Sequence, residues 1–210
     1  RVASRGLGDV YKRQISERPY WQRPPYKPDF KATRDDLVAQ IRTTLIESVT
    51  RRMRSDVPLA FCMSGGIDSN SIISIAAAHL GIDVHGFTIM NNDGRYDERE
   101  LVDISAHELK IRNEKIILKK EDFLPVLQSM IESRHGPVAT ISYYTQNYLY
   151  KSISNKGYKV AVSGTGADEL FSGYYDHHLL YFSSDFGDSS ERSLAMQNWE
   201  NYVKPVIRNT

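Results

Sequence analysis

Two short tracts rich in glycine, serine and aspartate follow apolar runs, and the first of them has the residue types of a phosphate-binding loop. It reads MSGGIDSN, from Met63 to Asn70. Gly65 and Gly66 let a ligand approach the backbone closely, and amides at a turn and a helix start attract anions. Ser64 and Ser69 add hydroxyl donors. The tract therefore predicts a phosphate cradle between a strand and a helix.

Asp68 adds a metal to this prediction. A carboxylate repels a phosphate group unless a cation lies between them, and Mg²⁺ bridges carboxylate and phosphate oxygens well. Asp68 therefore indicates a metal-chelated polyphosphate. The alternative is a tight turn in which Asp68 only caps the helix, and the residues leave both open. The tract has neither the Gly-Lys-Ser/Thr ending of a Walker loop nor the third glycine of a dinucleotide fingerprint.

The second tract, VAVSGTGADELFSGYY, covers residues 160–175 and repeats the pattern of strand, glycine turn and acidic pair. Asp168 and Glu169 are candidates to hold the same cation as Asp68, or they stabilise a helix start through its dipole. Ligands of open α/β sheets bind at the carboxyl ends of strands, where the strand order reverses. If the two preceding strands are neighbours, Asp68 and Asp168 can share one metal.

The elements that position these tracts alternate along the chain. Apolar runs predict strands at 58–63, 83–89, 113–118 and 158–164, with helices at 69–81, 96–109, 121–136 and 144–157. This alternation favours a parallel sheet covered by helices on both faces. A helix starting at Thr33 precedes the first strand, and residues 191–210 have a helical pattern. The buried side of helix 96–109 is expected to carry Leu101, Ile104, Ser105 and Leu109.

The composition excludes several classes of protein. The 210 residues carry a net charge of +1, so no global field points to a nucleic acid or a membrane surface. No apolar run reaches the roughly 18 residues of a membrane span, and a signal-peptide core is absent, so a cytoplasmic location is the default. Cys62 is the only cysteine, which excludes an internal disulfide.

Residues 1–30 are expected to be a non-native or linker segment. The first fourteen lack helical or strand periodicity, and the proline-rich 17–30 cannot form a regular helix. Residues 31–210 are expected to form the functional domain, with its C-terminal helical part truncated.

Both tracts resemble known signatures. SGGIDS (64–69) resembles the SGGxDS pyrophosphate loop of the ATP pyrophosphatases, or PP-loop enzymes, and SGTGADELFSGY (163–174) resembles the second signature of the glutamine-hydrolysing asparagine synthetase family. GFTI and YDE, after the second strand, fit the same family, so the resemblance spans roughly 33–175. It implies an adenine nucleotide alpha hydrolase-like (PP-loop ATPase) fold: an α/β parallel sheet sandwiched by helices.

The resemblance also implies an AMP-forming carbon–nitrogen ligase that uses ATP and Mg²⁺. A carboxylate, such as aspartate or a sugar acid, is adenylated and then attacked by ammonia from a glutaminase domain expected upstream; a homodimer is compatible with this. Asp68, Asp168 and Thr165 are the expected catalytic residues, with Asp68 and Asp168 on the metal. The expected nucleotide-binding residues are Met63, Ser64, Gly65, Gly66, Asp68, Ser69, Ile89, Ser163 and Gly164.

Thr165 departs from the family pattern, because typical asparagine synthetases have glutamate at this position. Thr165 cannot act as a carboxylate base, so another residue takes that role or the acceptor is not aspartate. Family members of surface-polysaccharide pathways resemble this variant. Two alternatives stay open: a nucleotide-binding module without synthetase activity, and another PP-loop ligase, of the tRNA-modifying or NAD-forming kind.

Overall fold

A computed structural model describes residues 18–24, 32–90, 97–118, 122–183 and 189–206. The chain divides into two compact units, residues 1–43 and 44–210. In the first unit, 18–24 form neither helix nor strand, while most of the expected linker segment 1–30 lies outside the described residues. Helix α1 (Arg34–Arg52) begins there with the predicted cap: Thr33 Oγ1 donates to Asp36 Oδ2 (2.6 Å) and accepts from the Asp36 amide (3.2 Å).

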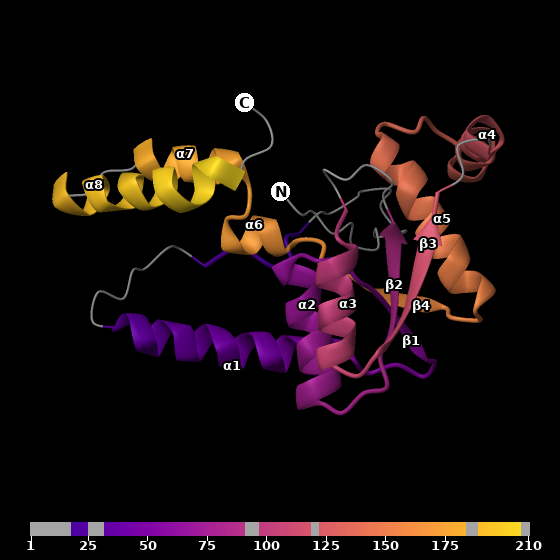
Figure 1. Cartoon of the computed structure of the whole chain (residues 1–210), viewed down its shortest axis with the longest axis horizontal. Helices are drawn as coiled ribbons and strands as arrows, with labels where there is room; N and C mark the ends of the chain where they lie inside the picture. The colour runs from indigo at the N-terminus through magenta and orange to yellow at the C-terminus, as the bar shows by residue number, and fades with distance from the viewer. Residues whose placement is uncertain (1–17, 25–31, 91–96, 119–121, 184–188, 207–210) are drawn as a thin grey trace, which may run out of the picture. The chain divides into compact units, whose positions relative to one another are not determined.

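The second unit contains the predicted parallel sheet (Figure 1). Its strands β1 (Leu59–Cys62), β2 (His85–Met90), β3 (Arg112–Ile117) and β4 (Val160–Val162) lie in the order β3-β2-β1-β4. Phe61 of β1 is in register with Gly86 on one side and with Val162 on the other. The strand order therefore reverses between β1 and β4. These two strands are neighbours, which was the condition for Asp68 and Asp168 to share one metal.

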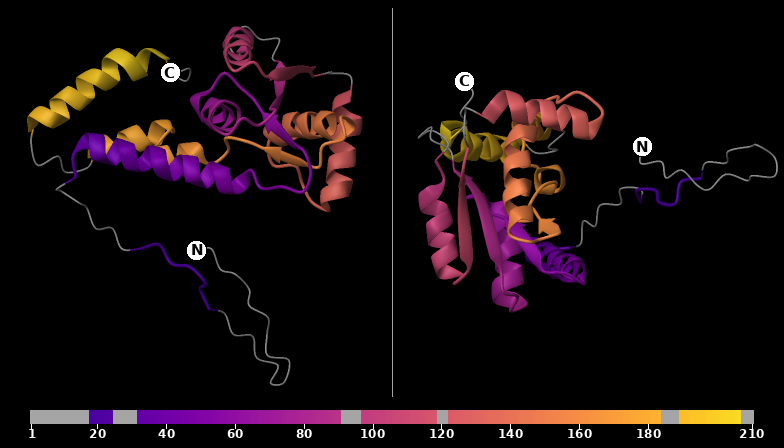
Figure 2. Two further views of the ribbon diagram at one scale, coloured as in Figure 1. Left: turned by 90° about the horizontal axis from the view of Figure 1, so that it is seen from below. Right: turned by 90° about the vertical axis from the view of Figure 1, so that its right-hand side faces the viewer.

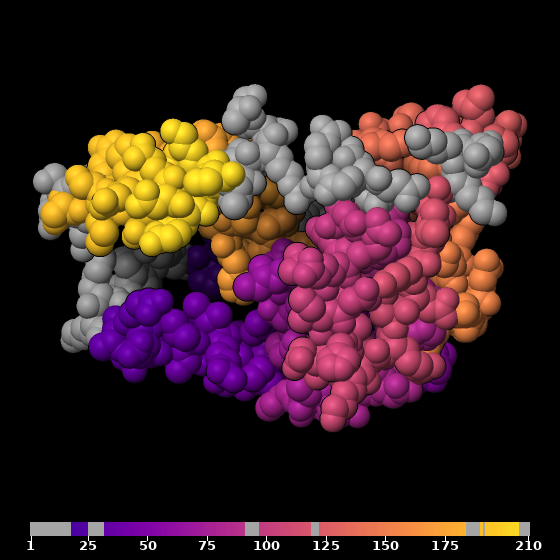
Figure 3. All heavy atoms as spheres, viewed as in Figure 1, coloured from indigo at the N-terminus to yellow at the C-terminus, as the bar shows by residue number. Residues whose placement is uncertain are grey.

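Helices cover both faces of this sheet because side chains of β1 alternate between two cores. Phe61 and Met63 pack with Ile73 and Val102 against α2 (Ile67–Ser74), the π-helix η1 (Ile75–His79) and α3 (Arg99–Glu108). Ala60 packs with Phe87 and Ile153 under α5 (Ile141–Asn155), on the opposite face (Figure 2). The side chains of α2 and α3 meet as adjacent packed surfaces in Figure 3. The predicted α/β sandwich is thus confirmed.

Two details differ from the sequence predictions. In α3 the fully buried residue is Val102, while Leu101 and Ile104 are more than half exposed, so the predicted buried face was wrong in part. A helix with apolar residues at several consecutive turns can bury either of two stripes, and packing against Phe61 selects the one with Val102. The predicted helix 69–81 ends as the π-helix η1, which periodicity does not signal.

The remaining helices precede α5 or follow β4 in the chain. Helix α4 (Phe123–Arg134) precedes α5, and α6 (Ala167–Phe171) follows β4. Helices α7 (Tyr175–Ser183) and α8 (Ser189–Asn198) are followed by η4 (Trp199–Val203) and η5 (Lys204–Val206), so the helical pattern after residue 191 is confirmed while α7 was not predicted. Within the described ranges, every helix is too short or too polar to span a bilayer.

Candidate active site

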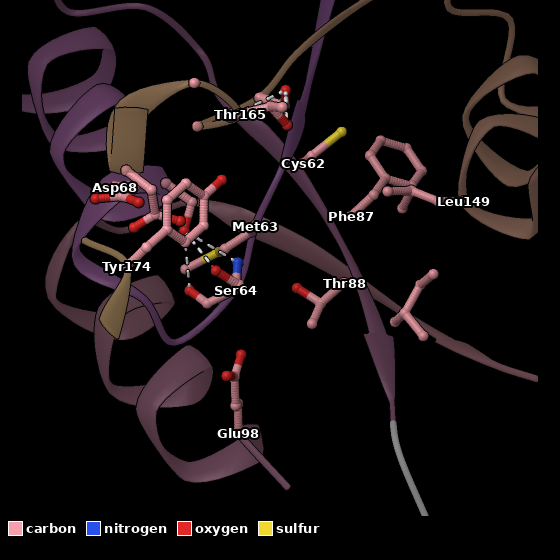
Figure 4. A pocket seen from close by; sticks show the side chains of 16 residues that line it. Cys62, Met63, Ser64, Asp68, Phe87, Thr88, Glu98, Leu149, Thr165 and Tyr174 are labelled. Atoms are coloured by element: carbon pink, nitrogen blue, oxygen red, sulfur yellow. Dashed lines mark hydrogen bonds between the residues drawn. The ribbon is translucent and has the colours of Figure 1, made fainter. Parts of the chain in front are cut away.

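A cavity of about 420 Å³ opens at the carboxyl ends of β1 and β4, where the strand order reverses (Figure 4). Most of the expected site residues lie in its wall: Met63, Ser64, Asp68, Ser69, Ile89, Ser163, Gly164, Thr165 and Asp168. Gly65 and Gly66 belong to the same turn but do not form part of the wall. The fold thus brings two tracts a hundred residues apart into one site.

Side-chain oxygens hold all three amides of the first turn. The Ser64 amide donates to Ser69 Oγ (3.2 Å), and the Gly66 amide donates to Ser64 Oγ (3.2 Å). The Gly65 amide donates to the carboxylate of Glu98 at 2.9 Å, across from the start of α3. Every amide donor of this turn is therefore paired with a side-chain oxygen of the protein itself.

Asn70 and Ser69 hold the carbonyl side of the same turn. Asn70 Nδ2 donates to the carbonyl oxygens of Ser64 (2.9 Å) and Gly66 (2.8 Å). The buried Ser69 hydroxyl lies 2.9 Å from that of Ser64, so the two hydroxyls share a hydrogen bond. These contacts shape the loop before any ligand arrives.

The second glycine turn packs directly on the first. A Cβ atom at Gly164 would lie 2.8 Å from the Ser69 amide nitrogen and 3.0 Å from the carbonyl carbon of Asp68. Gly166 has a φ of 97°, a conformation that favours glycine. Glycine is therefore required at 164 by contact and is favoured at 166 by backbone conformation.

Asp68 and Asp168 both face this cavity, with Tyr174 beside them. The pKa of Tyr174 is raised, first by its hydrogen bond to Glu169 (2.8 Å) and further by the charges of Asp168 and Asp68. Helix α2 begins without a side-chain cap, so Asp68 is not the cap considered as its alternative role. Glu169 accepts from Tyr174, which lowers the pKa of Glu169, and it does not line the cavity.

The two carboxylates suit a cation that a ligand helps to bind. Among the described residues, no three histidine, cysteine, aspartate or glutamate side chains converge on one point. Mg²⁺ is commonly bound by one or two carboxylates together with substrate phosphates and water, and Asp68 with Asp168 fits this donor set.

The opposite wall of the cavity is apolar. Cys62, Phe87 and Leu149 lie together on that side in Figure 4, away from Asp68 and Ser64. Burial raises the pKa of the Cys62 thiol to about 11, so the side chain is a neutral, weakly polar surface at neutral pH. The cavity therefore has a polar side, formed by the two glycine turns and the aspartates, and an apolar side.

The wall residues to which the sequence assigned no role include Glu98 and Tyr174. Glu98 belongs to the YDE tract and Tyr174 closes the second signature, so both stand inside the tracts that carry the resemblance. Their part in the site depends on hydrogen bonds between separate elements, which local patterns do not reveal.

Comparison with known proteins supports the resemblance. Residues 40–207 match the protein-family model described as "Asparagine synthase". A putative glutamine-hydrolysing asparagine synthetase 2 of Methanocaldococcus jannaschii is 30% identical over 179 residues, covering 85% of this chain and 34% of that protein. Glutamine-hydrolysing asparagine synthetase 1 of Bacillus subtilis is 32% identical over 152 residues, covering 71% of this chain and 24% of that protein. The chain thus spans about a third or less of the length of these relatives.

Solved structures align with this chain at lower sequence identity. The ammonia-dependent NAD synthetase of Campylobacter jejuni aligns with a TM-score of 0.43 at 16% identity, covering 82% of this chain and 79% of that one. The NMN synthetase of Francisella tularensis aligns with a TM-score of 0.41 at 14% identity, covering 85% of this chain and 76% of that one.

Proposed function

Because the chain belongs to the asparagine synthase family, we propose that it is an ATP-dependent synthetase domain that adenylates a carboxylate and releases pyrophosphate. The observation that carries this proposal is the meeting of two glycine turns and two aspartates, Asp68 and Asp168, at one cavity. Such a site suits a polyphosphate with a bound cation better than it suits a neutral ligand.

The polar side of the cavity would hold the phosphates. Ser64, Gly65, Gly66 and Ser69 would donate to pyrophosphate oxygens, and Asp68 with Asp168 would bind Mg²⁺. The metal, when bound, would neutralise the charge that grows on the leaving pyrophosphate. The backbone amides of the turn would stabilise that same charge once their present acceptors, the hydroxyls of Ser64 and Ser69 and the carboxylate of Glu98, give way to the phosphate oxygens.

The rest of the nucleotide would lie along the neighbouring wall. Ile89 and Met63 offer apolar surface and backbone to the adenine, while Ser163 and Gly164 would contact the nucleotide from the second turn. An acceptor carboxylate oxygen then attacks the α-phosphorus, and the bond from that phosphorus to the bridging oxygen breaks. Ammonia attacks the resulting acyl carbon, AMP leaves with the electron pair of the carbon–oxygen bond, and the nitrogen loses a proton.

Thr165 bears on the choice of acceptor. Its side chain lies in the cavity wall and accepts a hydrogen bond from the Ser163 hydroxyl (3.0 Å). A neutral hydroxyl here suits either aspartate or a sugar acid as the acceptor substrate. Because Thr165 cannot act as a base, another group would have to accept the proton that ammonia loses. The relatives are named as glutamine-hydrolysing, so a glutaminase region of a longer protein would supply the ammonia.

Product analysis tests the proposal. The chain is incubated with Mg²⁺, α-labelled ATP, ammonium and either aspartate or a panel of uronic acids, and nucleotide products are separated. AMP and pyrophosphate that depend on one acceptor are expected. ADP and inorganic phosphate as the only products would contradict the proposal.

A second candidate is a nucleotide-binding module without synthesis, and Thr165 in the position of the family glutamate favours it. Calorimetry separates the two. Tight binding of Mg·ATP with no AMP from any acceptor, even when the glutaminase region is present, would support the binding module.

A further inference from the structure

We propose that Glu98 is an internal competitor of pyrophosphate, an inference that rests on the nucleotide site proposed above. Its carboxylate occupies the Gly65 amide while the site is empty and is displaced when a phosphate group binds there. After the reaction it returns to the amide and favours the release of pyrophosphate.

The contact that motivates this role is specific. The Gly65 amide donates to Glu98 Oε2 at 2.9 Å, and Glu98 is half-buried in the cavity wall. In Figure 4 its carboxylate points towards the turn at Ser64. A Cβ on Gly65 would lie 3.2 Å from the Cβ of Glu98 and 3.0 Å from that of Leu101, so the turn rests on the start of α3. The carboxylate is therefore held within reach of the amide.

Glu98 differs in kind from the two serines that hold the neighbouring amides. The hydroxyls of Ser64 and Ser69 can rotate and donate to an incoming phosphate oxygen. An ionised carboxylate only accepts, so Glu98 cannot turn from competitor into ligand. Among these three partners of the turn, it alone must leave the amide.

The exchange also has an electrostatic component. A carboxylate and a phosphate oxygen compete for the same single N–H, and their negative charges repel one another at short range. Glu98 therefore lowers the affinity of the loop for pyrophosphate below what its amides alone would give. Weakened product binding is useful in a reaction whose leaving group is a strongly bound polyanion.

Binding of inorganic pyrophosphate to the full 210-residue chain tests the role by titration calorimetry with Mg²⁺ present. Glu98→Gln and Glu98→Ala are compared with Glu100→Gln, an exposed glutamate in the first turn of α3 that does not line the cavity. Removing the charge at 98 is expected to tighten binding about fivefold, since hydrogen bonds to charged groups exceed neutral ones by about 1 kcal/mol. The Glu100 variant is expected to match the unaltered chain.

Weaker or unchanged pyrophosphate binding in both Glu98 variants, with melting temperatures equal to that of the unaltered chain, would overturn the inference and make Glu98 a brace of the loop. The outcome is separable from that of the proposed function. If the variants bind pyrophosphate more tightly while no acceptor ever gives AMP, the synthetase proposal fails and the competitor role stands. If pyrophosphate binds to none of the proteins, both fail.

Discussion

Gly164 and Ser69 lie in backbone contact: a Cβ atom at Gly164 would come within 2.8 Å of the Ser69 amide nitrogen. The carboxyl ends of β1 and β4 are thus joined through their loops as well as through strand pairing. Neither loop can move away without opening the cavity between Asp68 and Asp168. The spacing of the two acidic groups therefore depends on a glycine rather than on an ion pair.

Gly164→Ala is expected to weaken nucleotide binding strongly. The two nearest atoms that the new methyl group meets are backbone atoms of Asp68 and Ser69, which cannot rotate away, so the turns must separate. Overpacking of this kind typically costs about 1–3 kcal/mol of folding free energy. Thermal melting and Mg·ATP calorimetry measure both effects. Gly136→Ala, where the nearest heavy atom to a Cβ is 3.9 Å away, is the matched control and should change neither.

Gly173→Ala is expected to act on the metal site and not on folding. A Cβ on Gly173 would overlap the Asp168 carboxylate and lie 2.7 Å from its Cγ. A short side chain can rotate away, so stability should be nearly unchanged while Asp168 loses its present position. We expect the Mg²⁺ concentration for half-maximal ATP binding to rise about tenfold or more. Unchanged Mg²⁺ dependence would show that the Asp168 position is not needed.

Protonation of His85 is expected to lower the free energy of unfolding in mild acid. Its pKa is lowered, chiefly by burial and next by the charge of Arg112, although Glu114 opposes this. His85 therefore binds a proton more readily in the unfolded chain than in the folded one. Its contribution to the free energy of unfolding is fully present above about pH 6.5, the pKa of histidine in an unfolded chain, and is lost as the pH falls from there towards the lower pKa of the folded state. The loss is at most about 1.4 kcal/mol per pH unit.

The measurement is the difference in melting temperature between pH 7.5 and pH 5.5. His85→Gln should reduce this difference even if it lowers both temperatures, since His85 also contacts the Tyr158 hydroxyl at 2.9 Å. His107→Gln removes an exposed histidine and should leave the difference unchanged. An equal acid shift in both variants would contradict the role of His85.

The order of strands and helices could be predicted from sequence because each element carries a local signal. Apolar runs such as that of β1 end at glycine turns, and residues around α1 supply a cap that the structure confirms through Thr33 and Asp36. The pairing of β4 with β1 was, from sequence, only the condition under which Asp68 and Asp168 could share a metal. No local pattern contains that pairing, because it joins Leu59 to Val160 across a hundred residues.

The site was predictable as a set of residues and not as a set of contacts. The cavity contains Asp68, Asp168 and Thr165 as expected, but Ser69 now bonds within its own turn and Glu98 occupies a loop amide. The Glu98 contact depends on where α3 starts relative to the first turn. The buried stripe of α3 was mistaken for the same reason, since packing and not periodicity selected Val102.

Asp68→Asn is expected to remove most of the Mg²⁺ dependence of ATP binding. In the unaltered chain the carboxylate repels Mg²⁺-free ATP and favours the chelated form, because a cation can lie between the two. The amide keeps the size of the side chain but loses the charge. Affinity for Mg²⁺-free ATP should therefore stay equal or rise, while the gain on adding Mg²⁺ should shrink about tenfold or more.

Calorimetric titrations with ATP in EDTA and in excess Mg²⁺ give the two affinities whose ratio matters. Asp176→Asn removes an exposed carboxylate at the start of α7, outside the cavity wall, and should keep the ratio of the unaltered chain. If Asp68→Asn also keeps that ratio, the metal is not held at Asp68. The phosphate-binding loop would then bind its ligand through amides and hydroxyls alone, and the charge of Asp68 would repel that ligand.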